Sequence, residues 1–176
     1  MSSKKIIAII GLMGVGKTTI GAKLAEKTKR YFLDCDAEIE DFENRNIKEI
    51  FAESGEKYFR EIEKKIIREI VLRDEEIVLS LGGGAFIDVD TRKLLKEKAV
   101  IIWLHASVET ILHRVGNKNT RPLLNQKNKR EILEELVAKR YPIYAEADLK
   151  FDTSDINHDT LINKIIREIK LLENEK

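Results

Sequence analysis

The stretch IIAIIGLMGVGKT, residues 6–18, decides the fold of this chain. Ile6–Ile10 is a short run of apolar, mostly β-branched residues, which predicts a buried strand. From Lys17 onward, the apolar residues Ile20 and Leu24 recur at helical spacing. The glycine-rich segment between them matches the pattern G-x-x-x-x-G-K-[ST], in the strand–loop–helix context that a phosphate-binding loop requires. The segment is therefore predicted to bind phosphate groups.

Each residue type in this loop suits phosphate binding. Its glycines allow the backbone to curl until successive N–H groups point inward, and the following helix adds the positive end of its dipole. Lys17 is expected to reach the β- and γ-phosphates, and the Thr18 hydroxyl to bind one Mg²⁺ ion that keeps most of its waters. Thr19 either touches the α-phosphate or only begins the helix. The predicted nucleotide-binding residues of the segment are Gly14, Val15, Gly16, Lys17, Thr18 and Thr19.

Four further apolar runs indicate strands, and amphipathic segments separate them. The strands are expected at Tyr31–Leu33, Ile77–Leu81, Val100–Leu104 and Leu149–Asp152. Helices are expected from Lys17, at Ala37–Asn44, at Ile47–Glu53 with a break at Gly55, and over residues 59–71, 90–96, 108–112, 132–141 and 161–172. Short strands that alternate with helices predict an α/β fold, and unbroken apolar strands predict a parallel sheet covered on both faces. Ligands of such folds bind beyond the carboxyl ends of the strands.

Composition narrows the class of protein. The chain has 176 residues, which suits one domain with a sizeable core, and its 36% of charged residues balance to a net charge of +1. We therefore expect neither a nucleic-acid binder nor a membrane binder. The single cysteine, Cys35, excludes an internal disulfide, and no apolar run approaches the roughly 20 residues that span a bilayer. A reducing, cytoplasmic location and a monomeric chain are expected.

Two carboxylates, Asp34 and Asp36, follow the second predicted strand. In an extended chain, residues two apart point to the same face. One carboxylate could then hold Mg²⁺ through water while the other holds a substrate hydroxyl. An alternative role for Asp36 is to cap the short helix expected at Ala37–Asn44, and the two roles can coexist.

Other polar or glycine-rich features each have a structural and a functional interpretation. Arg60 and Glu63 are neighbours on a helix and could form an ordinary surface ion pair. Gly82–Gly84 ends the third strand as either a tight turn or a close backbone approach to a ligand. Arg121 lies in a basic polar loop that could simply be solvated. Arg140 continues the apolar face of its helix, so it either snorkels outward or binds an anion in a cleft.

Taken together and in this order, these features resemble the shikimate kinase family along nearly the whole chain. The matching segments are GLMGVGKTTIG at 11–21, DCD at 34–36, GEKYFREIE at 55–63, LGGGA at 81–85, RPLL at 121–124 and KRYPIY at 139–144. The resemblance implies a three-layer P-loop kinase fold over residues 1–176, with a five-stranded parallel sheet of order 2-3-1-4-5. It also implies transfer of the γ-phosphoryl group of ATP to the 3-hydroxyl of shikimate, with one Mg²⁺ ion, in the pathway to chorismate and the aromatic amino acids.

The resemblance also implies roles for residues on the acceptor side, a region of about residues 34–63. Asp36 would act as base or orienter for the attacking hydroxyl, and Asp34 would hold a water of the Mg²⁺ ion. Arg60 and Arg140 would clamp the substrate carboxylate, with Glu63 positioning Arg60. The remaining acceptor contacts implied are the backbone of Gly83 and the rings of Phe51 and Phe59.

On the nucleotide side, the resemblance implies a mobile lid at about residues 113–124. Arg121 would reach the ATP phosphates from this lid, and Arg114 would lie against the adenine. Together with Lys17 and Asp36, Arg121 completes the expected set of catalytic residues. The family often carries a basic residue and a proline in the adenine loop after the last strand, whereas this chain has DTSDIN at 152–157. No site residue is therefore assigned there.

Two alternative functions remain open at this point. A carboxylate clamp would also suit a P-loop kinase for another small polyol, such as gluconate, although the combination of GEKYFREIE with three glycines favours shikimate. A nucleotide-binding regulatory module without catalysis is opposed by an intact set of polar residues, namely Lys17, Thr18, Asp34, Asp36 and Arg121. An N-K-x-D guanine reader, expected in a GTPase, does not occur.

Overall fold

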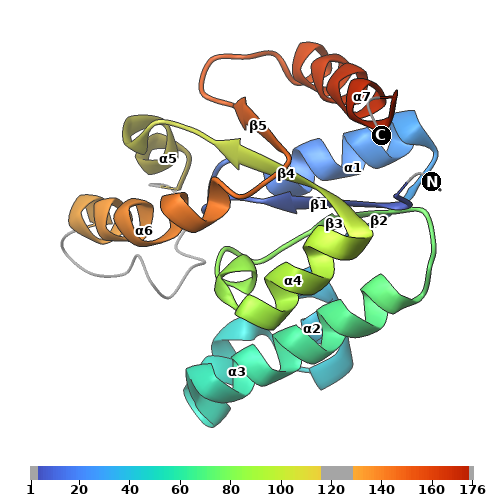
Figure 1. Ribbon diagram of the computed structural model, residues 1–176. Helices are drawn as coiled ribbons and strands as arrows, with labels where there is room; N and C mark the ends of the chain where they lie inside the picture. Colours follow the sequence, from blue (N-terminus) through green and yellow to red (C-terminus); the bar gives the residue numbers. More distant parts are fainter. Residues whose placement is uncertain (1–3, 116–128, 175–176) are drawn as a thin grey trace.

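A computed structural model describes residues 4–115 and 129–174 of the chain. Its centre is a five-stranded parallel sheet of order β2-β3-β1-β4-β5 (Figure 1), which confirms the expected topology. The strands are β1 (Ile6–Ile10), β2 (Tyr31–Asp34), β3 (Ile77–Ser80), β4 (Ala99–His105) and β5 (Leu149–Asp152). All five predicted strands are present. Their carboxyl ends lie together at one edge of the sheet, where the phosphate loop, the Asp34–Asp36 segment and the three glycines begin.

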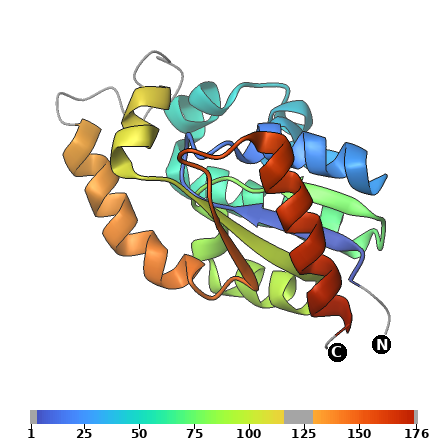
Figure 2. The same cartoon turned by 90° about the horizontal axis from the view of Figure 1, so that it is seen from above.

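Helices cover both faces of this sheet. They are α1 (Lys17–Thr28), α2 (Cys35–Glu43), α3 (Ile47–Leu72), α4 (Val89–Lys98), α5 (Val108–Val115), α6 (Lys129–Tyr144) and α7 (His158–Asn174), with a short 3₁₀ helix at Ala85–Ile87. Helices α1 and α7 pack together on one face, and α4, α3 and α2 lie on the opposite side (Figures 1 and 2). The expected three-layer arrangement is thus confirmed. No helix in the described part of the chain is both long and apolar enough to cross a membrane.

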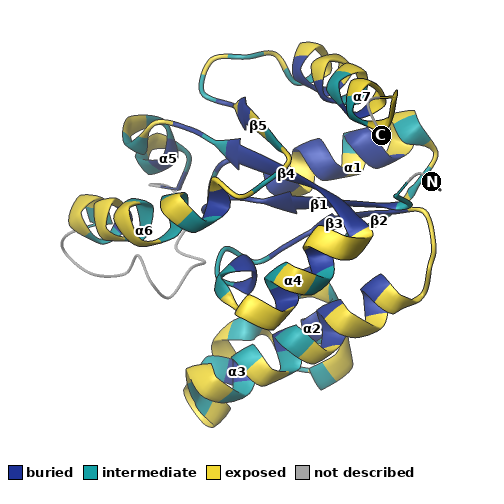
Figure 3. Cartoon of the chain, in the orientation of Figure 1, coloured by how far each residue is buried: buried dark blue, intermediate teal, exposed yellow. Residues whose placement is uncertain are grey.

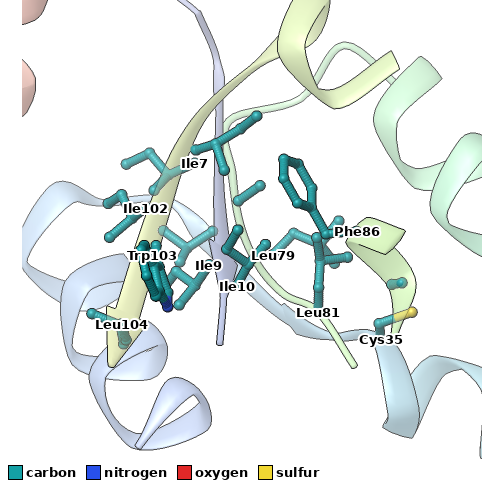
Figure 4. Packing of buried hydrophobic residues seen from close by; sticks show 14 of the residues in the cluster. Ile7, Ile9, Ile10, Cys35, Leu79, Leu81, Phe86, Ile102, Trp103 and Leu104 are labelled. Atoms are coloured by element: carbon teal, nitrogen blue, oxygen red, sulfur yellow. The ribbon is translucent and has the colours of Figure 1, made fainter. Parts of the chain in front are cut away.

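The core consists of the strands and the inner faces of these helices (Figure 3). All residues of β1 and β3 are buried, which is why these strands are unbroken apolar runs rather than alternating ones. Figure 4 shows Ile9, Ile10, Trp103 and Leu79 packed around β1 and its neighbours. Because the buried strands are held in place by this packing, the polar residues that follow their carboxyl ends are held in place too.

Helix α3 shows how local sequence positions the acceptor side. It begins with a capping box, in which the Asn46 side chain accepts from the Glu49 N–H and the Glu49 carboxylate accepts from the Asn46 N–H. Gly55 interrupts the helix with φ of 79° and ψ of 171°, a conformation that favours glycine. The predicted break at Gly55 is correct, although helical turns continue on both sides of it. Arg60 and Glu63 follow this kink by five and eight residues.

Candidate active site

The phosphate loop has the backbone that its glycines predict. Gly14 and Gly16 have φ values of 77° and 93°, and Gly16 stands at the N-cap position of α1 without a side-chain cap. A methyl group on Gly14 would lie 2.9 Å from the Val115 side chain, so α5 also requires glycine there. Because glycine has no side chain to cap the helix, the first N–H groups of α1 are available to a phosphate bound in the loop. The positive end of the helix dipole points toward the same phosphate position.

Lys17 lies inside the curl of this loop. It is 9% exposed, and its Nζ donates to the carbonyl oxygens of Gly11 and Leu12, each at 3.0 Å. The loop backbone thus holds the ammonium group beside the N–H groups of the helix start. Such an arrangement concentrates positive charge where a polyphosphate would bind.

The two predicted metal-binding residues are in contact. Thr18 Oγ1 donates to Asp34 Oδ2 at 2.8 Å, and Asp34 Oδ1 accepts from the Asp36 N–H at 3.1 Å. A hydroxyl and a carboxylate, side by side at the edge of the phosphate loop, are the oxygen ligands that Mg²⁺ prefers. The donor set therefore fits the ion that the sequence led us to expect.

The alternative reading of Asp36 as a helix cap is wrong. Helix α2 begins at Cys35, two residues earlier than expected, and its N-cap is Asp34. Asp36 lies in the first turn of α2, where a negative charge interacts favourably with the helix dipole, and it is not the N-cap residue. The expected extended conformation of residues 34–36 is wrong for the same reason, because the helix already begins at Cys35, whose side chain is buried.

The three glycines are places of close approach rather than a plain turn. A methyl group on Gly84 would lie 2.5 Å from the Arg60 guanidinium, and one on Gly83 would lie 2.8 Å from Arg140 Nη1. The corresponding position on Gly82 lies 2.7 Å from Glu63 Oε1 and 3.1 Å from Asp36 Oδ1. Two guanidinium groups and two carboxylates thus converge on one short segment, which brings together Asp36, Arg60, Glu63, Gly83 and Arg140.

Arg60 is held by its own helix. Its Nη1 donates to Glu63 Oε2 at 2.7 Å, and its Cζ lies 5.1 Å from the centroid of the Phe59 ring. Phe51 packs on Phe59 with ring centroids 4.7 Å apart. The pairing of Arg60 with Glu63 is therefore not an ordinary surface ion pair, because Glu63 is only 2% exposed.

Glu63 contributes a buried negative charge to the site. Burial raises the pKa of its carboxyl, an effect that the charge of Arg60 opposes and that of Asp36 reinforces. Its Oε1 has no hydrogen-bond partner among the described residues. A cavity of about 510 Å³ opens beside this cluster, and Arg60, Glu63, Gly84 and Arg140 line it. The cavity is large enough for a small hydroxylated acid, and its lining includes two arginines whose planar guanidinium groups suit a carboxylate.

Arg114 has contacts that the sequence did not suggest. Its Nη1 donates to the Gly14 carbonyl at 3.3 Å and to Thr153 Oγ1 at 3.1 Å, and its Nη2 donates to the Thr153 carbonyl. Residues 152–157 were assigned no site role, yet Thr153 is buried beside the phosphate loop. The available signal was a hydroxyl residue immediately after the last strand, at the ligand-binding edge of the sheet.

Tyr144 is a second residue that sequence reasoning missed. It is fully buried, and its hydroxyl donates to the Gly83 carbonyl. Burial raises its pKa to about 12, so the group remains a donor throughout the physiological range. It follows Arg140 by one helical turn on α6, and this spacing is the signal that could have found it.

The predicted lid lies mainly outside the described residues. Residues 113–115 belong to α5, whereas 116–124, including Arg121, are not described. Of the predicted site residues that the structure describes, Asp36, Arg60 and Arg140 meet at Gly82–Gly84. Lys17 and Arg114 contact the phosphate loop, and Thr18 contacts Asp34.

Comparison with known proteins identifies the family. The family model described as shikimate kinase matches residues 13–170. A shikimate kinase from Caulobacter vibrioides is 43% identical over 166 residues, covering 94% of this chain and 82% of the relative. The structure of shikimate kinase from Acinetobacter baumannii in complex with shikimate superposes with a TM-score of 0.89 and 36% identity, covering 96% of this chain and 93% of the other.

A gluconokinase from Sinorhizobium meliloti superposes less well. Its TM-score is 0.57 at 17% identity, with 99% of this chain and 97% of the other covered, a likeness of fold alone. The family model that matches residues 13–170 and the 43% identity over 94% of this chain and 82% of the Caulobacter relative favour the shikimate kinase family over the gluconokinases. This chain belongs to the shikimate kinase family.

Proposed function

We propose that this member of the shikimate kinase family transfers the γ-phosphoryl group of ATP to the 3-hydroxyl of shikimate. The observation that carries the proposal is the convergence of Asp36, Arg60 and Arg140 on Gly82–Gly84, beside the phosphate loop. A phosphate donor and a hydroxylated carboxylic acid could bind there side by side. Phosphoryl transfer asks a protein mainly to position two reactants and to stabilise charge, and this cluster of residues suits both tasks.

On the donor side, the loop N–H groups and Lys17 bind the phosphates. Thr18 and Asp34 are the residues that would hold one Mg²⁺ ion. The ion, when bound, neutralises negative charge on the β- and γ-phosphates. Lys17 is already held within the loop by the carbonyls of Gly11 and Leu12, so little reorientation separates its ammonium group from the phosphates.

On the acceptor side, Arg60 and Arg140 bind the carboxylate of the substrate. An anionic acceptor next to ATP would be repelled without them, and a planar guanidinium can bind two carboxylate oxygens at once. The backbone of Gly83 contacts the substrate. A glycine is needed at this position because a larger residue would collide with Arg140. Phe51 and Phe59 supply an apolar wall for the carbocycle.

Asp36 orients the attacking hydroxyl and accepts its proton. It is half-buried in the first turn of α2, close to the metal-binding Asp34 and to the clamp. Because phosphoryl transition states are loose, much of its contribution comes from orientation of the oxygen before the proton moves. Arg121, which lies outside the described residues, completes the proposed catalytic set by the role that the family resemblance implies, namely stabilisation of the transferring phosphoryl group.

The test is ADP release measured with the purified chain, ATP and Mg²⁺. Shikimate should start turnover, whereas gluconate and other hydroxylated acids should support at most a small fraction of it. Proton–phosphorus coupling in the NMR spectrum of the product should identify the 3-position. Turnover on gluconate equal to that on shikimate would assign the site to the other polyol, and nucleotide binding without any turnover would favour a regulatory module.

A further inference from the structure

Three segments far apart in the sequence meet at the side chain of Thr153. The residue follows β5 and is 3% exposed, and its N–H extends the sheet by donating to the His105 carbonyl at 2.8 Å. Its hydroxyl donates to the carbonyl of Val15, in the phosphate loop, at 2.9 Å. The same hydroxyl accepts from Arg114 of α5 at 3.1 Å, which uses both its donor and an acceptor function. Thr153 therefore joins the sheet edge, α5 and the phosphate loop.

The carbonyls held in this way belong to the peptides that face the phosphate position. A peptide group is planar and trans, so the C=O of Val15 and the N–H of Gly16 point in opposite directions. The Gly14 carbonyl, held by Arg114 at 3.3 Å, is likewise opposite to the N–H of Val15. Fixing these two carbonyls on the outside of the loop directs two N–H groups to its inside.

Outside anchors matter here because the loop itself is compliant. Gly14 and Gly16 flank the two peptides, and glycine resists a change of backbone conformation less than any other residue. A flipped peptide would present a carbonyl oxygen, instead of an N–H group, to the phosphates. A buried donor that engages the Val15 carbonyl opposes this flip, because the flip would leave both the donor and the carbonyl without their hydrogen bond.

We propose that Thr153 is a positioning residue for nucleotide binding, which together with Arg114 holds the Val15–Gly16 peptide of the phosphate loop in its anion-binding orientation. The inference rests on the proposed function, since it assumes that this loop binds the phosphates of ATP. It gives Arg114 a role toward the loop backbone in addition to the expected contact with the adenine.

The test compares Thr153→Val with Thr153→Ser and with a matched control. Valine keeps the shape and branching of threonine but removes the hydroxyl, whereas serine restores the hydroxyl. Thr160→Val makes the same chemical change at an exposed position near the start of α7. Calorimetry with ADP and with inorganic tripolyphosphate measures phosphate binding with and without the adenosine moiety, and shikimate binding serves as the internal reference.

Thr153→Val should weaken binding of both ADP and tripolyphosphate about 3- to 10-fold, as expected for one lost hydrogen bond. Thr153→Ser should recover most of that affinity, and Thr160→Val should match the parent chain. In turnover, KM for ATP should rise more than KM for shikimate. A purely structural role for Thr153 would lower the melting temperature without this selective loss.

The outcomes separate the two proposals. Failure of the parent chain to bind ADP or tripolyphosphate would overturn the proposed function itself. Normal binding by the parent with equal binding by Thr153→Val would overturn only the positioning role. A loss for ADP but not for tripolyphosphate would also overturn it, because the effect would then lie with the adenosine moiety rather than with the loop peptides.

Discussion

Replacement of Asp36 by asparagine separates its chemical role from its structural one. Asparagine keeps the shape of the side chain but cannot accept a proton. Because Asp34 is the N-cap of α2 and accepts from the backbone N–H of residue 36, the substitution leaves this cap in place. We expect kcat to fall about 10²- to 10⁴-fold, the usual contribution of a positioned general base.

The electrostatics of the site set the expected change in stability. Oxygens of Asp36 and Glu63 lie 3.1 and 2.7 Å from the same point beside Gly82, so the two carboxylates are within about 6 Å of each other. At that separation two unit charges repel by roughly 0.7–3 kcal/mol for effective dielectric constants of about 80 to 20. Solvent around the partly exposed Asp36 and the charges of two nearby arginines screen this repulsion, so a value near the lower end of the range is expected. Asp36→Asn should leave the melting temperature unchanged or raise it by about 2–4 °C.

The assay pairs steady-state turnover with thermal unfolding, and Asn46→Ala provides the control. Asn46 caps α3 through a capping box, away from the proposed chemistry. Its loss should cost about 0.5–2 kcal/mol of stability and leave turnover near that of the parent chain. Full activity of Asp36→Asn would refute the proposed role, and so would a loss of stability as large as that of Asn46→Ala.

Three further predictions concern the clamp, Tyr144 and His105. Arg60→Ala or Arg140→Ala should each weaken shikimate binding about 10- to 100-fold in calorimetry, with a far smaller effect on ADP, because each removes one charge-assisted contact. Tyr144→Phe, which deprives the Gly83 carbonyl of its donor, should raise KM for shikimate about 3- to 10-fold. An unchanged KM would remove Tyr144 from the acceptor site. Burial lowers the pKa of His105 below 6.5, so the folded chain binds fewer protons than the unfolded chain, and the urea midpoint should fall as pH decreases from about 7 to about 5. His105→Asn should reduce the change of the urea midpoint with pH. An equal change in the variant and the parent chain would show that His105 is not the group responsible.

Features encoded by local sequence could be predicted well. The phosphate loop, the five strands and the break at Gly55 each depend on residues within one turn or one strand. The order of the sheet came instead from the resemblance to a family, because five parallel strands can be arranged in many ways. The helix start at Cys35 was missed because a buried cysteine after a strand gives no signal for a cap one residue earlier.

Contacts between distant segments could not be predicted from the residues alone. The hydrogen bond from Thr153 to Val15 spans 138 residues, and the one from Tyr144 to Gly83 spans 61. Each hydrogen bond joins a side chain to a backbone carbonyl. Because every residue has such a carbonyl, the identity of the accepting residue does not indicate which side chain it pairs with. Only the fold brings the two groups within reach of each other.

The three glycines determine how closely the two halves of the site can approach. The side-chain position of Gly83 lies 2.8 Å from Arg140 Nη1 and 3.5 Å from the Gly11 carbonyl of the phosphate loop. That of Gly84 lies against Arg60, which Glu63 holds from the buried side. A methyl group in this segment would therefore displace a charged group of the clamp or separate the clamp from the phosphate loop. Because transfer between two bound reactants depends steeply on their distance, the absence of side chains here contributes to function as directly as the charged residues do.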